Sequence, residues 1–266
     1  MVMSMMETSP DWLHWLYDGS ALAVGYTSRG LDAVHQKFDE SYGAYEGFNI
    51  CHYTGDETAH VDSCRQKLCD ALGVGLDSLI VPRQTHSVNV FVVDKPMSMG
   101  RDTELDGVDA VVTSTRGLVI GVSTADCLPV VIYDRNAGVA GVAHAGWRGA
   151  VGGIIDRTVD TMIDMGASAS CMSVWFGPAI CAGCFEVGEE VASRFPASCV
   201  ERQSGLKPHV NLPEFAVGRL IESGVEAKNI HPFSTDLCTR CHPSRYFSAR
   251  ASGVNSGRNF TFVMLK

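Results

Sequence analysis

Residues 118–150 read LVIGVSTADCLPVVIYDRNAGVAGVAHAGWRGA, and this stretch decides the expected fold. Two apolar runs, Pro129–Tyr133 and Val139–Ala143, are separated by DRNAG, a sequence typical of turns. The pattern predicts a β-hairpin. A hairpin returns the chain to the end where it started, so Cys127 and His144, which flank the open end, are expected to face each other.

Charged and flexible residues surround this thiol and imidazole. Asp126 lies directly beside Cys127, and the sequence GWRG at 146–149 follows His144. Glycine allows close approach of the backbone to a ligand, and arginine supplies a fixed cationic fork. A further imidazole, His86, falls in an irregular loop between two predicted strands, where functional residues often lie.

The rest of the chain predicts a single α/β domain in which helices cover a mixed or antiparallel sheet. Short apolar runs predict further strands at residues 79–81, 88–93, 107–113, 118–122, 172–176, 229–233 and 260–265. Helical spacing of apolar residues predicts helices at residues 57–72, 153–165, 187–195 and 211–223. Residues 1–20 are expected to form a variable, poorly defined start, and residues 21–266 the domain itself.

Composition narrows the class of protein. The 266 residues carry a net charge of −9 and no basic run, which disfavours nucleic acids and anionic membranes as partners. Neither a signal peptide nor an apolar stretch of ~18 residues is recognisable, so we expect a cytoplasmic protein. In that compartment the ten cysteines are expected to be reduced thiols rather than disulfides.

Three interpretations of Cys127 and His144 remain open on spacing alone. Cysteine can be a buried apolar filler. It can be a nucleophile with His144 as base and Asp126, or another acceptor, orienting the imidazole. It can also ligate zinc together with His144, in which case His86 is the best third ligand and the fourth position stays open.

Several motifs closely resemble the YfiH/YlmD family, whose members were called laccase-domain or multicopper polyphenol oxidases and are now described as purine nucleoside phosphorylases. The resemblance runs from about Gly25 to the C-terminus. It rests on residues 83–86 (RQTH), 109–113 (DAVVT), 124–127 (TADC), 144–149 (HAGWRG), 177–180 (GPAI), 185–188 (FEVG), 238–239 (CT), 247–250 (FSAR) and 257–258 (GR).

The resemblance implies a layered α/β/β/α sandwich related to cysteine hydrolases of the cytotoxic-necrotizing-factor type, forming one catalytic domain over residues 21–266. It also implies one zinc ion held by His86, Cys127 and His144. The implied activities are phosphorolysis of adenosine, inosine, guanosine and methylthioadenosine, and deamination of adenosine. Copper-dependent oxidation of phenols is also described for the family, but multicopper sites need more histidines than this trio supplies.

These activities require sites for phosphate and nucleoside around the metal. Arg148 is the first candidate for binding phosphate, and Arg29 and Arg250 are weaker ones, as is Arg258. Asn49 is a candidate for contacting sugar or base, and Asp126 is expected to belong to the catalytic group. We expect a monomer or a weak dimer. The chief rival is a metal-free cysteine amidase that uses Cys127 and His144, for example on cell-wall precursors; a binding module without catalysis ranks third.

Two Cys-x-x-Cys pairs, Cys181/Cys184 and Cys238/Cys241, suggest a second metal site. About fifty residues, with a predicted helix and strand, separate the pairs. Of the local glycines typical of metal-binding turns, only Gly183 is present. The resemblance implies only one metal site, elsewhere in the chain, so we expect the pairs not to bind a second zinc ion.

Overall fold

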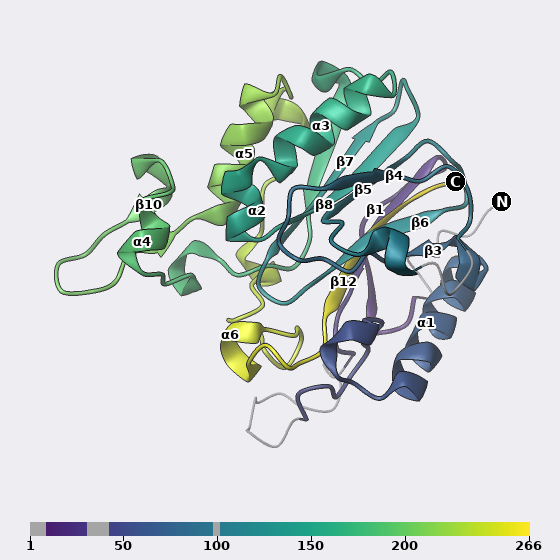
Figure 1. The fold of residues 1–266 in the computed structure, drawn as a ribbon, viewed down its shortest axis with the longest axis horizontal. Helices are drawn as coiled ribbons and strands as arrows, with labels where there is room; N and C mark the ends of the chain where they lie inside the picture. The colour runs from purple at the N-terminus through teal and green to yellow at the C-terminus, as the bar shows by residue number, and fades with distance from the viewer. Residues whose placement is uncertain (1–8, 31–42, 98–101) are drawn as a thin grey trace.

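Two five-stranded sheets form the centre of the computed structural model, which describes residues 9–30, 43–97 and 102–266 (Figure 1). The first sheet has the strand order β1-β2-β12-β6-β3. Its strands are β1 (Leu13–Asp18), β2 (Leu22–Thr27), β12 (Asn259–Leu265), β6 (Val119–Thr124) and β3 (Leu79–Ile80). The β3–β6 pair is parallel and the other pairs are antiparallel, so this sheet is mixed.

The second sheet has the order β4-β5-β8-β7-β9 and contains the predicted hairpin. Its strands are β4 (Val90–Val92), β5 (Ala110–Thr113), β8 (Val139–Ala145), β7 (Leu128–Asp134) and β9 (Met172–Phe176). Neighbouring residues of β7 serve different cores: Val130 packs on the helical side and Val131 packs between the sheets. Strands buried on both faces read as continuous apolar runs, which explains the sequence of β7.

Helices cover both outer faces, so the layers run α/β/β/α as expected (Figure 1). On the first sheet lies α1 (Thr58–Leu72), whose Leu68 packs in one core with Phe260 and Phe262. The second sheet is covered by α2 (Trp147–Gly152), α3 (Ile154–Asp164) and α5 (Leu212–Glu222). The short elements are α4 (Glu189–Ala192), β10 (Val200–Glu201), β11 (His209–Val210) and α6 (Ala249–Ser252).

The register of the hairpin brings its two functional ends together. Pro129 pairs with His144 and Leu128 with Ala145 across the antiparallel β7–β8 ladder. Cys127 therefore lies one residue beyond the paired end of β7, beside the end of β8. The predicted juxtaposition of Cys127 and His144 is confirmed in this respect.

Three local predictions were wrong. Residues 13–18, expected in a poorly defined start, form β1, because Leu13 is buried and the strand pairs along β2. The helix predicted at 187–195 is only α4, since the chain turns before Pro196. Residues 229–233 form no strand; Ile230 makes a single bridge to Val174. Among the described residues, every helix is too short or too polar to cross a bilayer.

Candidate active site

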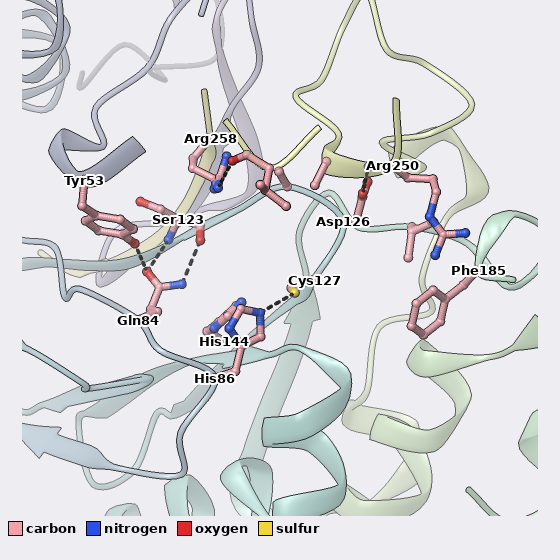
Figure 2. Close-up of a pocket in the computed structure, with 14 residues that line it drawn as sticks. Tyr53, Gln84, His86, Ser123, Asp126, Cys127, His144, Phe185, Arg250 and Arg258 are labelled. Atoms are coloured by element: carbon pink, nitrogen blue, oxygen red, sulfur yellow. Dashed lines mark hydrogen bonds between the residues drawn. The ribbon is translucent and has the colours of Figure 1, made fainter. Parts of the chain in front are cut away.

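The three predicted metal-ligating side chains meet at the open end of the hairpin (Figure 2). Cys127 precedes β7, His144 lies in β8, and His86 comes from the loop between β3 and β4. Cys127 Sγ and His86 Nε2 are 3.6 Å apart, and the two imidazole centroids are 4.9 Å apart. One ligand atom from each residue lies within 4.8 Å of the other two. The trio can therefore bind a single metal ion.

Two neighbouring positions have features that allow these side chains to approach closely. His86 has φ +62°, a left-handed conformation that costs a non-glycine residue about 1–3 kcal/mol. Gly146 has no side chain because a Cβ atom there would lie 2.9 Å from Cys127 Sγ and 2.7 Å from His86 Cδ2. The glycine after His144 thus makes room for the trio.

Asp109, immediately before β5, holds two of the three side chains in place. Its carboxylate accepts a hydrogen bond from His144 Nδ1 at 2.7 Å. The same carboxylate accepts bonds from the backbone N–H groups of Thr85, His86 and Ser87 at 3.0, 3.0 and 2.8 Å. Because a carboxylate only accepts, Nδ1 of His144 carries hydrogen and Nε2 is left for a metal ion.

Sequence reasoning offered Asp126 as a possible partner of the imidazole, and the structure corrects this. The Asp126 carboxylate accepts hydrogen bonds from Thr239 Oγ1, Ser248 Oγ and Arg250 N, all at 2.6 Å. It therefore organises the neighbouring loops. The true orienting residue, Asp109, was present in a recognised motif, and its signal was a carboxylate immediately before a fully buried strand.

The electrostatics of the metal-free site favour a charged pair. Burial by itself raises the pKa of the Cys127 thiol, but His144 and His86 outweigh it and lower the pKa from 9.0 to about 6. Burial also opposes charge on His144, yet Cys127 and Asp109 raise its pKa from 6.5 to about 9. At neutral pH, metal-free protein therefore holds a thiolate beside an imidazolium.

In metal-free protein, Cys127 is expected to react with iodoacetamide with a pH midpoint near 6 rather than near 9. The folded-state pKa is lowered, so the reactive thiolate is present above this midpoint and is lost below it. Mass spectrometry of the Cys127 peptide, after chelation and labelling across a pH series, measures the midpoint. Denatured protein supplies the reference. A midpoint near 9 in the folded protein would contradict the charged pair.

A cavity of ≈ 450 Å³ opens beside the trio, within the range of small-molecule sites. Tyr53 and Gln84 line one side, where Tyr53 Oη donates to Gln84 Oε1 at 3.0 Å. Phe185 and Arg250 line the opposite side, with the guanidinium 6.0 Å from the ring centroid (Figure 2). Arg258 also lines the cavity. Of these five residues, sequence reasoning proposed only the two arginines as ligand-binding.

The remaining predicted residues lie elsewhere. Arg148 is exposed and stacks over Trp147, its Cζ 4.4 Å from the ring centroid, and it does not line the cavity. Arg29 is 2% exposed and donates to the backbone carbonyls of Glu46 and Gly43. Arg29 therefore has a structural role.

Asn49 is also buried away from the cavity. Its Nδ2 donates to Asp56 Oδ2 at 2.8 Å, and its Oδ1 accepts from the backbone N–H of Cys51 and of Arg258. Both the nitrogen and the oxygen of the side-chain amide are therefore hydrogen-bonded within the protein. The structure gives Asn49 a supporting role behind Arg258 instead of direct contact with the cavity.

Comparison with known proteins places this arrangement in a family. Residues 34–266 match the family model described as "Multi-copper polyphenol oxidoreductase laccase". The chain belongs to this laccase family. It is 42% identical to "Adenosine deaminase RL5" from an unknown prokaryotic organism, over 84% of this chain and 88% of that protein. It is 33% identical to "Purine nucleoside phosphorylase" from Bacteroides thetaiotaomicron, over 85% and 87% of the two chains.

Solved structures of laccase-family relatives share the fold. YlmD from Geobacillus stearothermophilus superposes with a TM-score of 0.82 at 26% identity, covering 97% of this chain and 94% of that one. YfiH from Bacillus licheniformis gives a TM-score of 0.80 at 27% identity, covering 92% and 93%. The resemblance to the YfiH/YlmD type and the layered fold are thus confirmed.

The donor set of this laccase-family member suits one metal ion. One thiolate and two imidazoles are donors that suit a metal ion with three protein ligands, and all three residues line the cavity. A multicopper cluster requires more histidines. Within residues 9–30, 43–97 and 102–266, the trio is one of two candidate metal groups, and the other contains no histidine.

That second group consists of the two Cys-x-x-Cys pairs, and it corrects the sequence argument about them. The sulfur atoms of Cys181, Cys184, Cys238 and Cys241 all lie within 4.8 Å of one another. Separation by about fifty residues had suggested that the pairs lie apart. The fold brings the two pairs together because a parallel β-bridge between Ala179 and Cys238 joins the two segments that carry them.

Proposed function

We propose that this protein is a zinc-dependent purine nucleoside enzyme. It catalyses phosphorolysis of adenosine, inosine, guanosine and methylthioadenosine, and deamination of adenosine at the same site. The observation that carries the proposal is the His86, Cys127 and His144 trio, which opens onto a cavity of ≈ 450 Å³. The names of the relatives, an adenosine deaminase and a purine nucleoside phosphorylase, support the substrate class.

The protein contributes orientation and binding around the metal. When bound, zinc supplies a Lewis acid that activates water or a substrate oxygen. Asp109 orients His144 and the loop that carries His86. Phe185 and Tyr53 offer aromatic surfaces for the purine on either side of the cavity. Stacking on an aromatic ring does not depend strongly on which purine base is bound.

Phosphate is assigned to Arg250 in place of Arg148. Within the described part of the chain, the Arg250 guanidinium donates one hydrogen bond, from Nη2 to the carbonyl of Glu186 at 3.0 Å. Arg258 is more fully engaged, because Nη1 and Nη2 donate to carbonyls of residues 254, 256 and 257. Arg250 thus retains free donors for the charge-assisted, bidentate contacts that phosphate favours.

The two reactions differ in what they consume. In phosphorolysis a phosphate oxygen bonds to ribose C1′ while the bond from C1′ to N9 breaks. The purine leaves with the electron pair and takes up a proton. In deamination, water adds at C6 of adenosine and ammonia leaves, which gives inosine. Chromatography of products from adenosine and inosine, with and without phosphate, tests the proposal; intact nucleosides after incubation with zinc-loaded protein would refute it.

Changing Arg250 to alanine is expected to raise the KM for phosphate and to reduce inosine phosphorolysis by about 10-fold or more, since a charge-assisted contact is worth about 1.5–3 kcal/mol. Adenosine deamination is expected to fall much less. Arg148→Ala is the matched control, because it removes an arginine outside the cavity. Equal losses of the two activities in Arg250→Ala would remove Arg250 from the phosphate role.

A metal-free cysteine hydrolase is the second candidate, and one observation favours it. Cys127, His144 and Asp109 form the order of nucleophile, base and orienting carboxylate, and the Cys127 thiol has a pKa lowered to about 6. Such an enzyme would hydrolyse amides after complete removal of metal. The proposed nucleoside enzyme would lose its activity under the same treatment, so chelation followed by both assays separates the two.

A further inference from the structure

Two pairs of cysteines that are far apart in sequence converge at one point of the fold, outside the His86 site. Cys181 directly precedes the 3-10 turn Ala182–Cys184, which follows β9, and Cys184 is the last residue of this turn. Cys238 and Cys241 follow a second such turn, Thr235–Leu237. All four are free thiols whose sulfur atoms lie within 4.8 Å of one another.

The backbone brings the two pairs together. The segments run parallel at the bridge between Ala179 and Cys238. The N–H of Ala179 donates to the carbonyl of Leu237, and the N–H of Thr239 donates to the carbonyl of Ala179, both at 3.1 Å. The positions of the thiols are therefore set by main-chain pairing of the loops.

The local geometry is that of a metal-binding thiolate cluster. The backbone N–H of Cys241 donates to Cys238 Sγ at 3.4 Å, and the N–H of Cys181 donates to the same sulfur at 3.3 Å. Cys184 Sγ and Cys241 Sγ are 3.4 Å apart. A disulfide requires ~2.05 Å, whereas Zn–S bonds of ~2.3 Å in a tetrahedron separate sulfur atoms by about 3.8 Å.

Burial argues against a role as apolar filler. Cys238 is buried, but Cys181 and Cys184 are half-buried and Cys241 is exposed. Cysteines that merely fill a core lie fully inside it. Four thiols gathered around one point, three of them at least partly accessible, instead match the closed S₄ donor set typical of structural zinc.

We propose that Cys181, Cys184, Cys238 and Cys241 bind a second zinc ion, a structural one with no open coordination position. This inference does not rest on the proposed nucleoside activity. It concerns ligands that share no residue with the His86, Cys127 and His144 trio.

The second zinc ion braces the wall of the active site. The N–H of Ile180, next to Cys181, donates to the Asp126 carbonyl at 2.9 Å. Thr239 Oγ1, next to Cys238, donates to the Asp126 carboxylate at 2.6 Å. Asp126 has φ +87° and immediately precedes Cys127. Joining the two loops through zinc therefore holds the strained residue that positions the catalytic thiolate.

Metal analysis of purified protein, after dialysis against a weak chelator, tests this proposal. The wild type is expected to retain about two zinc ions per chain, and a Cys184→Ser/Cys241→Ser double variant about one. His86→Ala is expected to lose the other ion and keep this one. Cys171→Ser changes a half-buried free thiol elsewhere and is the matched control, with unchanged metal content.

Cobalt substitution and melting give two further readouts. In His86→Ala protein, cobalt is expected to show the intense thiolate charge-transfer absorption of an S₄ site, and the double variant is expected to lose it. The Tm should fall in the double variant. If that variant fails to fold, the single Cys241→Ser change at an exposed position gives the same comparison.

Three results would overturn the proposal. One is a wild type with a single zinc ion that disappears entirely in His86→Ala. Another is full metal content in the double variant or in Cys241→Ser. The third is a mass lower by the hydrogens of four thiols, which would show two disulfides in place of a metal site.

Discussion

Changing His86 to alanine is expected to remove the catalytic metal ion and to abolish both nucleoside activities. The site offers three ligands, and two remain after the substitution. Metal affinity should therefore fall by more than the ~10–100-fold that follows the loss of a residue hydrogen-bonded to a ligand. His86 is exposed, so the substitution should leave the folded structure intact. Metal content, adenosine deamination and inosine phosphorolysis are measured on one preparation.

His52→Ala is the control for this variant. His52 also lies near the surface, and its imidazole pairs with the carboxylate of Asp62 at 2.7 Å. Its change is expected to leave metal content and both rates within error of wild type. Retention of activity by His86→Ala protein from which the metal has been lost would exclude zinc from the reaction and favour the cysteine hydrolase. Copper in place of zinc in the wild type would favour the oxidase instead.

Changing Asp109 to alanine is expected to have the second-largest effect, because it lowers both the stability of the fold and the metal affinity of the site. Asp109 is fully buried, and its removal leaves the N–H groups of Thr85, His86 and Ser87 without their acceptor. We expect a loss of about 3 kcal/mol or more in the free energy of unfolding. For a chain of this size, that corresponds to a Tm lower by about 6–12 °C.

The site should also weaken in the Asp109→Ala variant. Without the Nδ1 hydrogen bond, His144 no longer has a fixed tautomer and ring orientation, so metal affinity should fall by ~10–100-fold. Calorimetry measures the stability, and competition with a chelator measures the affinity. Asp106→Ala is the control, because Asp106 is half-exposed and pairs only loosely with Arg83 at 3.8 Å. Wild-type metal affinity in the Asp109 variant would contradict the orienting role.

The sequence predicted the central hairpin well because its signals are local. Apolar runs either side of DRNAG give β7 and β8, and the pairing of Pro129 with His144 follows from a hairpin of that length. Helix α5 was likewise predictable, since Asn211 caps it and accepts from Glu214 N. Strand β1 was missed because it depends on pairing with β2, which in turn pairs with β12, and only the assembled sheet provides this arrangement.

In the candidate site, too, the residues with local sequence signals were predictable and those that depend on tertiary contacts were not. Cys127 and His144 were predictable from the hairpin, and His86 from its place in a loop between strands. The role of Asp109 was not predictable, because the hydrogen bond to His144 in β8 joins residues 35 positions apart, and Asp109 lies just before another strand, β5. The choice between Arg148 and Arg250 likewise depended on which guanidinium faces the cavity, and spacing along the chain carries no such information.

By itself the sequence determined the hairpin, the α/β class with helices covering sheet, and the thiol and imidazoles at the end of the hairpin. These follow from periodicity and turn chemistry, which act over a few neighbouring residues. The tertiary structure alone decided that Asp109 orients His144, that Arg250 faces the cavity, and that the two Cys-x-x-Cys pairs meet. Those contacts join distant segments, and their geometry exists only once both sheets and their loops are packed.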